Sequence, residues 1–266
     1  MIPFQEILKH TKHFPPEVIE KDYCLTWLLW GLSHSILATE ITFYGGTAIK
    51  KMYSPDFRYS EDLDFISEKN ISQKRVLSAI GSITQLIINA VNITFYIKEE
   101  SFSLKDDRLQ FIIEYDGFPE IILTKQIKFD LCINQTLLEK VKNRTIISSY
   151  SDNNKTGGML LTYSKEALAA EKISAVFDAT RKEPRDLYDL AYLLKQKPAR
   201  LKILHLLKKK YGFIPPLSSI LDSINSDIYK ARWQVRLGNQ VPKLQKIDTI
   251  TLALIKSLNE VYKKHD

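Results

Sequence analysis

The 266-residue sequence has few of the residues that mark secreted, membrane-spanning or zinc-binding proteins. Its two cysteines, Cys24 and Cys132, cannot build a disulfide framework, and no histidine and cysteine spacing fits a zinc site. No apolar run reaches membrane-spanning length, and the N-terminal residues lack the charged-then-apolar order of a signal peptide. None of the five histidines lies in a motif, which argues against histidine-based catalysis. We therefore expect a cytoplasmic location.

The composition is that of a soluble globular protein, with 44% hydrophobic and 26% charged residues, enough for one large or two modest domains. The formal net charge is +7, which favours a polyanionic partner such as an NTP or a nucleic acid. Basic residues cluster at 50–51, at 208–210, at Arg232 with Arg236, and at 263–264. For any single cluster, a solubilising surface is the simpler interpretation.

One stretch, from Tyr44 to Phe65, carries the first chemical signal. Residues 41–44 predict a buried strand, Gly45 and Gly46 end it, and residues 47–52 predict a short helix. A glycine turn that opens a helix leaves backbone N–H groups and the positive end of the helix dipole facing outward. Because glycine also allows close approach to the backbone, this turn suits a phosphate.

The second signal is the pair Asp62 and Asp64, in a predicted strand over residues 62–66. Residues two apart in a strand share a face, so both carboxylates point one way while Leu63 and Phe65 point to a core. Two like charges so close are costly without a cation, and carboxylates that share a phosphate-bound ion describe a Mg²⁺ site. The alternative is a hairpin turn followed by a solvated acidic strand end.

A third carboxylate lies on a later strand. Strand-like runs cover residues 93–98, 109–115 and 121–133, and the last alternates so that Asp130 lies on the face opposite its apolar residues. Asp130 is thus the natural companion of Asp62 and Asp64. The alternative is an exposed edge strand with a polar outer face.

Together, Gly-Gly-Thr at 45–47, a short helix and loop, and Arg-x-Ser-x-Asp-x-Asp at 58–64 resemble the signature of DNA-polymerase-β-like nucleotidyltransferases. More narrowly, the sequence resembles the AbiEii toxin family. The resemblance implies a Mg²⁺-dependent enzyme, or Mn²⁺ in its place, that transfers NMP from an NTP to an acceptor hydroxyl. It implies RNA, tRNA above all, as acceptor, and a cognate antitoxin. Small-molecule or protein acceptors stay open, as does a catalytically silent RNA-binding relative.

The predicted site combines both signals. Asp62, Asp64 and Asp130 are predicted to hold the metal. The residues predicted to bind the nucleotide are Gly45, Gly46, Thr47, Lys50, Arg58, Ser60 and Lys172.

The predicted fold class is α/β (α+β): a minimal nucleotidyltransferase fold with a mixed sheet, followed by a mostly helical C-terminal half. Residues 145–158 are rich in Ser, Asn, Asp and Gly and lack periodicity, so they predict a boundary or loop. We expect a nucleotidyltransferase domain over 1–150 and a helical domain over 151–266 that completes the active-site cleft. The expected helices cover residues 17–33, 72–90, 164–180, a segment from 184, 201–211, 217–228 and 247–263.

Lys172 lies inside the apolar stripe of the helix predicted over 164–180, so its ammonium needs a negative partner or must reach the surface along its stem. A triphosphate and an internal carboxylate, Glu114 or Asp186, are the candidates; the resemblance favours the triphosphate. Arg-Asp-Leu-Tyr-Asp-Leu at 185–190 resembles the family's late motif. There Asp186 either orients Lys172 or activates the acceptor hydroxyl, or it joins Arg185 in a structural ion-pair network. The role of Asp189 stays open.

Two other stretches have simpler explanations. Residues 20–23, Glu-Lys-Asp-Tyr, resemble an opening of the same family, and we expect a structural role for them. Trp233 between Arg232 and Arg236 could hold a nucleotide chain, but a tryptophan that anchors the helical core is the commoner case.

Overall fold

The computed structural model describes residues 1–152 and 157–263. The chain forms two compact units: unit 1 comprises Met1–Leu137 and Val141–Thr162, and unit 2 comprises Leu138–Lys140 and Tyr163–Asp266. The predicted domain limit at residue 150 thus falls inside unit 1. Residues 153–156 of the predicted boundary loop, and Lys264 of the last basic cluster, lie outside the described residues.

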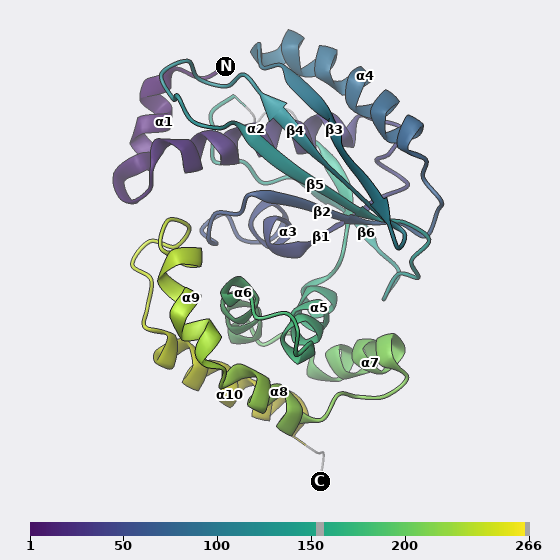
Figure 1. Cartoon of the computed structure of the whole chain (residues 1–266), viewed down its shortest axis with the longest axis vertical. Helices are drawn as coiled ribbons and strands as arrows, with labels where there is room; N and C mark the ends of the chain where they lie inside the picture. The colour runs from purple at the N-terminus through teal and green to yellow at the C-terminus, as the bar shows by residue number, and fades with distance from the viewer. Residues whose placement is uncertain (153–156, 264–266) are drawn as a thin grey trace. The chain divides into compact units, whose positions relative to one another are not determined.

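Unit 1 is a seven-stranded mixed sheet with helices packed on it, in the strand order β3-β4-β5-β2-β1-β7-β6 (Figure 1). Its strands are β1 Thr42–Tyr44, β2 Asp62–Ile66, β3 Phe95–Lys105, β4 Arg108–Tyr115, β5 Gln126–Cys132, β6 Lys142–Thr145 and β7 Met159–Thr162. Its helices are α1 Phe4–His10, a 3-10 turn Thr11–His13, α2 Pro16–Ser33, α3 Gly45–Met52 and α4 Gln73–Val91. Strand β2 runs parallel to β5 and antiparallel to β1. The α/β fold class is confirmed.

Most of the predicted elements are present, and the misses have physical causes. Strand β2 has the predicted bounds, and the Ser72 hydroxyl caps α4 by accepting from Arg75 N at 3.3 Å. The strand predicted over 121–133 begins only at Gln126, because Ile122 is 93% exposed and belongs to a loop. Strands β6 and β7 are four residues each, too short to show a periodic pattern, and were not predicted.

A row of phenylalanine rings fixes the register at the centre of the sheet. Phe43, Phe65, Phe129 and Phe111, from β1, β2, β5 and β4, follow one another with centroids 4.7–5.1 Å apart. All four are fully buried. A slip of one residue would turn these rings to the opposite face, so the row determines which polar residues meet there.

Helices α2 and α4 cover the apolar face of the sheet (Figure 1). They approach closely at Gly31, where a Cβ would lie 3.1 Å from Ile83 Cβ. The stripe predicted for α4 is buried at Val76, Ile80, Ile83 and Ile87, and the prediction is wrong only for Leu86, which is 38% exposed. The polar face of the sheet is therefore the one that carries Asp62 and Asp64.

Unit 2 is helical within its described residues. Its helices are α5 Lys165–Phe177, α6 Pro184–Lys195, α7 Arg200–Tyr211, α8 Leu217–Ile224, α9 Asp227–Leu237 and α10 Ile247–Tyr262. Ser164 caps α5, accepting from Ala167 N at 3.2 Å. The single helix predicted over 217–228 is instead split between α8 and α9. No helix in the described part of the chain combines the length and the apolar character needed to cross a membrane.

Trp233 of α9 is 5% exposed, and its indole N–H donates to the carbonyl of Gln245 at 2.9 Å. Its neighbour Arg236 forms an ion pair with Glu183, with Nη2 and Oε2 2.8 Å apart. Trp233 is therefore a core anchor of unit 2, the simpler of the two explanations drawn from the sequence.

Candidate functional site

The polar face of the sheet brings the predicted carboxylates onto neighbouring strands. In the parallel pairing of β2 with β5, Asp62 lies opposite Lys128 and Asp64 lies opposite Asp130. Residues opposite each other in a ladder share a face, so Asp62, Asp64 and Asp130 lie on one side of the sheet. Asp62 and Asp64 are half-buried, whereas Asp130 is only 3% exposed.

The Asp130 carboxylate is held by neighbours that the sequence interpretation missed. Arg108 of β4 donates to it from Nε, 2.7 Å from Oδ1, and from Nη2 to Oδ2, while Gln110 Nε2 lies 2.6 Å from Oδ2. The hydrogen bonds with Asp130 raise the pKa of Arg108 above its ordinary value, so the guanidinium stays charged. Alternation along β4 could have placed Arg108 and Gln110 on this face, but only once β4 was known to neighbour β5.

In the residues that the structure describes, no three His, Cys, Asp or Glu side chains are grouped so as to hold a metal ion. The three predicted metal ligands are thus on one face, but Asp130 is turned to Arg108 rather than grouped with Asp62 and Asp64.

The glycine turn is packed directly against the carboxylate pair. Gly45 has φ +80°, and a Cβ at this position would lie 2.9 Å from Cγ of Asp64. Thr47 of α3 donates its hydroxyl to the carbonyl of Asp62 at 2.5 Å. The start of α3 is therefore fixed against β2, and only glycine at position 45 leaves room for the Asp64 carboxylate.

We expect Gly45→Ala to lower the free energy of unfolding by about 2 kcal/mol or more, since it adds the cost of a left-handed backbone to a steric clash. In an Asp64→Ala background the contacts of the added methyl with Oδ2 and Cγ are gone and only the Cβ contact at 3.0 Å is left, so the same change should cost less, about 1 kcal/mol. Urea unfolding of the four proteins in this double-mutant cycle measures the coupling. Gly81→Ala, where a Cβ meets nothing within 4 Å, is the control and should not destabilise. Additive costs would contradict the packing argument.

Lys50 and Lys51 are buried and do not form a surface basic cluster, which corrects the surface interpretation of residues 50–51. Lys50 donates to the carbonyls of Pro55 and Phe57 at 2.7 and 3.0 Å and lies over the Tyr59 ring. Burial lowers its pKa. The Lys50 ammonium therefore holds the loop that leads into β2, and its predicted role in nucleotide binding stays a prediction.

Lys51 is 2% exposed and forms an ion pair with Asp22 of α2, with Nζ and Oδ2 2.7 Å apart. Burial lowers the pKa of Lys51 to about 8, although Asp22 opposes this shift. Glu20 accepts from the backbone N–H of Phe118 at 2.6 Å and pairs with Lys125 at 3.0 Å. The structural role expected for residues 20–23 is therefore confirmed for Glu20 and Asp22.

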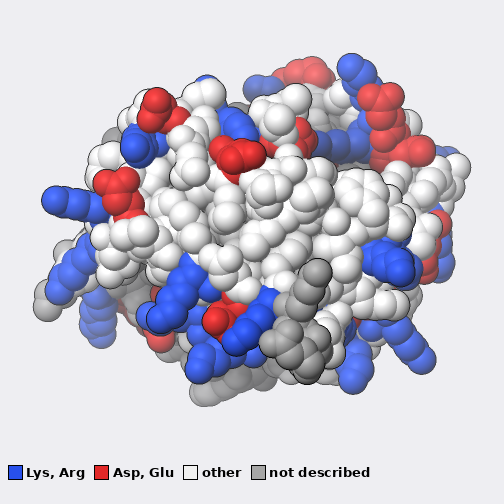
Figure 2. All heavy atoms as spheres, turned by 90° about the horizontal axis from the view of Figure 1, so that it is seen from below, with Lys and Arg blue, Asp and Glu red and all other residues white. Residues whose placement is uncertain are grey.

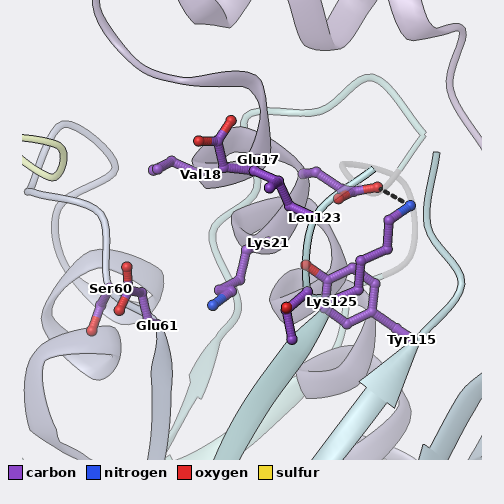
Figure 3. A pocket seen from close by; sticks show the side chains of 10 residues that line it. Glu17, Val18, Lys21, Ser60, Glu61, Tyr115, Leu123 and Lys125 are labelled. Atoms are coloured by element: carbon purple, nitrogen blue, oxygen red, sulfur yellow. Dashed lines mark ion pairs between the residues drawn. The ribbon is translucent and has the colours of Figure 1, made fainter. Parts of the chain in front are cut away.

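Two hollows share Lys21 and Glu61 in their lining, and Asp62 lines one of them. One, of about 280 Å³, is lined by Val18, Ser60, Glu61, Tyr115 and Leu123 among others. Figure 3 shows the Lys21 ammonium pointing into it, between Ser60 and Glu61 on one side and Tyr115 and Lys125 on the other. The other, of about 380 Å³, adds Asp62, Gln110 and Lys128.

Ser60, which the sequence predicts to bind the nucleotide, thus lines a cavity, as does Lys21, for which the sequence predicted no role in binding. Lys21 lies between Glu20 and Asp22 on α2, both of which are buried. Nothing in this local sequence indicates that the Lys21 side chain faces a cavity. Arg58, also predicted to bind the nucleotide, is 3% exposed and donates from Nη1 to the carbonyl of Tyr59 at 2.9 Å.

In unit 2, Lys172 has internal carboxylate partners. Its Nζ lies 2.7 Å from Oδ1 of Asp186 and 2.7 Å from Oδ2 of Asp189, and Arg181 Nε lies 2.7 Å from Oδ2 of Asp186. Burial alone would raise the pKa of Asp186, but Lys172 and Arg181 hold it at about 2. Of the two internal partners considered for Lys172, the structure has Asp186. Arg185 instead pairs with Glu183, at 3.2 Å.

Residues 27–261 match the sequence model of a protein family, the nucleotidyl transferase AbiEii toxins of type IV toxin–antitoxin systems. The chain belongs to the AbiEii family. The resemblance seen in the sequence is thereby confirmed, and the AbiEii protein is a nucleotidyltransferase. Membership of a toxin–antitoxin family implies an NTP substrate and an antitoxin partner.

Two solved structures share the fold of this chain. The nucleotidyltransferase toxin MenT4 of Mycobacterium tuberculosis H37Rv is 16% identical, with a TM-score of 0.68 over 100% of this chain and 91% of that one. A putative nucleotidyltransferase from H. pylori is 18% identical, with a TM-score of 0.61 over 94% and 98%. No functionally curated protein matches the AbiEii chain. At these identities the likeness shows the fold alone.

Proposed function

We propose that this AbiEii protein transfers a nucleoside monophosphate from an NTP to a hydroxyl of RNA, with tRNA the first candidate, in a Mg²⁺-dependent reaction. The observation that carries the proposal is the Asp62 and Asp64 pair on β2, packed against the Gly45 turn that opens α3. Carboxylates beside a phosphate-binding backbone are what a metal-assisted phosphoryl transfer needs.

The carboxylate pair fits Mg²⁺ without a third protein ligand. Mg²⁺ is commonly bound by one or two carboxylates together with substrate phosphates, rather than by a cage of protein ligands. Asp62 and Asp64 would hold it, and Asp130 would join them on release from Arg108. When bound, Mg²⁺ would neutralise charge on the phosphates and make the acceptor hydroxyl more acidic. Mn²⁺ could take its place.

The residues around the pair supply binding and orientation. The backbone N–H groups at Gly46 and Thr47, at the start of α3, bind the phosphates, while the Thr47 side chain keeps β2 in place. Lys21 and Ser60, which line the smaller of the two hollows, contact the nucleotide there. The roles predicted for Lys172 and Asp186 stay predictions, which substitutions at each position can test by activity.

RNA is the favoured acceptor because the chain is basic, with a formal net charge of +7 and a sequence pI of about 9.1. Small molecules and proteins are the alternative acceptors. A silent RNA-binding relative is disfavoured, because a protein that only binds RNA gains nothing from paired carboxylates beside its anion site.

Incubation of the purified protein with each labelled NTP, Mg²⁺ and total tRNA tests the proposal. We expect label on RNA, lost with EDTA and lost in Asp64→Ala. Label on protein or on small molecules would replace the proposed acceptor but keep the enzyme class. Absence of any label, together with tight and salt-sensitive RNA binding, would contradict the enzymatic proposal.

A further inference from the structure

Positive charge is distributed unequally between the two units. Unit 2 contains 21 of the 38 Lys and Arg residues but only 12 of the 31 Asp and Glu residues, so it carries +9 and unit 1 carries −2. The whole basic excess of the chain therefore belongs to the helical unit, although the carboxylate pair lies in unit 1. An excess of this size on one unit is the electrostatic footprint expected of a nucleic-acid partner.

A hollow of about 760 Å³ lies within unit 2 where the end of α6, the start of α7 and the end of α10 meet. Five cations line it against one carboxylate, that of Glu260. They are Lys195, Lys197, Arg200, Lys256 and Lys263. We call this set the basic hollow. Figure 2 shows one face of the molecule, on which Lys and Arg side chains, with Asp and Glu side chains among them, surround a broad uncharged area.

The four lysines of the basic hollow are exposed, and no ion pair is described for any of them. Lys195 is the last residue of α6 and Lys197 lies in the connection to α7, whereas Lys256 belongs to α10 and Lys263 directly follows it. Cations of like sign gathered around a concave surface repel one another, so the arrangement costs free energy unless an anion is bound.

Arg200 differs from the four lysines because its guanidinium has a structural role. Its Nη1 donates to the carbonyls of Glu260 and Lys263, at 3.3 and 2.6 Å. It therefore fixes the end of α10 against the start of α7 and sets the shape of the hollow. The floor between the cations is apolar, formed by Leu194 and Val261, which are 4% and 6% exposed, together with Pro198.

We infer that the basic hollow binds the sugar–phosphate backbone of an RNA, an inference that rests on the proposed transfer to RNA. Several cations spaced around one concavity fit a chain of phosphates, since each phosphate can meet its own lysine. The apolar floor can accept the face of a ribose or an unstacked base between phosphates. A helical unit with this surface would bind acceptor RNA by its backbone, with little dependence on sequence.

The test compares Lys195→Gln/Lys197→Gln/Lys256→Gln with a matched variant, Lys230→Gln/Lys243→Gln/Lys246→Gln. Both variants remove three exposed lysines of unit 2, and only the first changes the basic hollow. Binding of fluorescently labelled total tRNA is measured by anisotropy, without NTP, as a function of salt. We expect the first variant to bind about tenfold more weakly or worse, with a log–log salt slope smaller by about 2. The matched variant should change far less. Thermal unfolding checks that both fold.

The outcomes separate the two proposals. If the wild type labels and binds RNA and both triple variants bind equally, the basic hollow is not the RNA site and the proposed function stands. If the wild type neither binds nor labels RNA, both proposals fail. If the basic-hollow variant keeps RNA binding but loses binding to a co-expressed cognate antitoxin, the surface is a protein interface and the inference is overturned. With RNA far above its Kd, the basic-hollow variant should regain wild-type kcat, because only the KM of RNA depends on this surface.

Discussion

Asp64→Asn is expected to lower the rate of nucleotidyl transfer by about a thousandfold or more, which corresponds to about 4 kcal/mol of transition-state stabilisation. Asparagine has the shape of aspartate, so it keeps the packing against Gly45 and removes only the negative charge. The change therefore tests whether the carboxylate holds a metal-bound triphosphate, and not whether the turn is intact. Asp62→Asn should act in the same direction, since Asp62 shares the face of Asp64.

Steady-state transfer of labelled NMP at saturating Mg²⁺, with thermal unfolding measured in parallel, checks this expectation. Asp106→Asn is the matched control, because Asp106 is an exposed acid of the same unit in the turn between β3 and β4. Its activity should stay within a factor of two or so of wild type, as for surface substitutions in general. An Asp64→Asn protein that folds normally and retains full transfer would refute the role given to the carboxylate pair.

Asp130→Asn distinguishes between two roles of Asp130, metal binding and the positioning of Arg108. If Asp130 joins the metal during transfer, its loss should resemble the loss of Asp64. If it serves only to hold Arg108, the substitution should have a smaller effect on activity. An asparagine side chain has one acceptor oxygen, so it could keep one of the two hydrogen bonds from Arg108 and would lose the other.

Local patterns predicted the centre of unit 1 well. The alternation of Asp62, Leu63, Asp64 and Phe65 gave the bounds and the facing of β2, since a strand with one buried face leaves little freedom of register. The alternation through Asp130 likewise gave its face on β5, although not where that strand begins.

The ion pairs that could not be predicted from the sequence join segments that are distant along the chain. The sequence predicts a surface cluster at Lys50 and Lys51. The cause is that Asp22, which pairs with Lys51 in the core, lies 29 residues away along the chain. The pairing of Arg108 with Asp130 likewise requires the order of β4 and β5 in the sheet. Lys21 was not singled out because its neighbours Glu20 and Asp22 are buried, and nothing in the local sequence shows that the Lys21 side chain lines a cavity.

Lys172→Met is expected to be the most destabilising single change, lowering the free energy of unfolding by about 3–5 kcal/mol. Methionine keeps the volume of the stem but removes the cation from Asp186 and Asp189, which are 1% and 0% exposed. Arg181 still contacts Asp186, but the ammonium that both carboxylates share is gone. Lys208→Met, at an exposed lysine of α7, is the control and should change stability by less than about 0.5 kcal/mol.

The dependence of stability on pH distinguishes lost charge pairing from lost packing. In the wild type the pKa of Asp186 lies at about 2, below its ordinary value of 3.8. A lowered pKa stabilises the fold above pH 3.8, and this contribution is lost as the pH falls towards 2. In Lys172→Met only Arg181 opposes the effect of burial, so the pKa of Asp186 is higher than in the wild type and protonation in acid relieves part of the buried charge. The difference in unfolding free energy between the two proteins, measured by urea unfolding from pH 7 to pH 3, should therefore shrink as the pH falls. A difference that stays constant over this range would show that Lys172 stabilises unit 2 through packing of its stem and not through its charge.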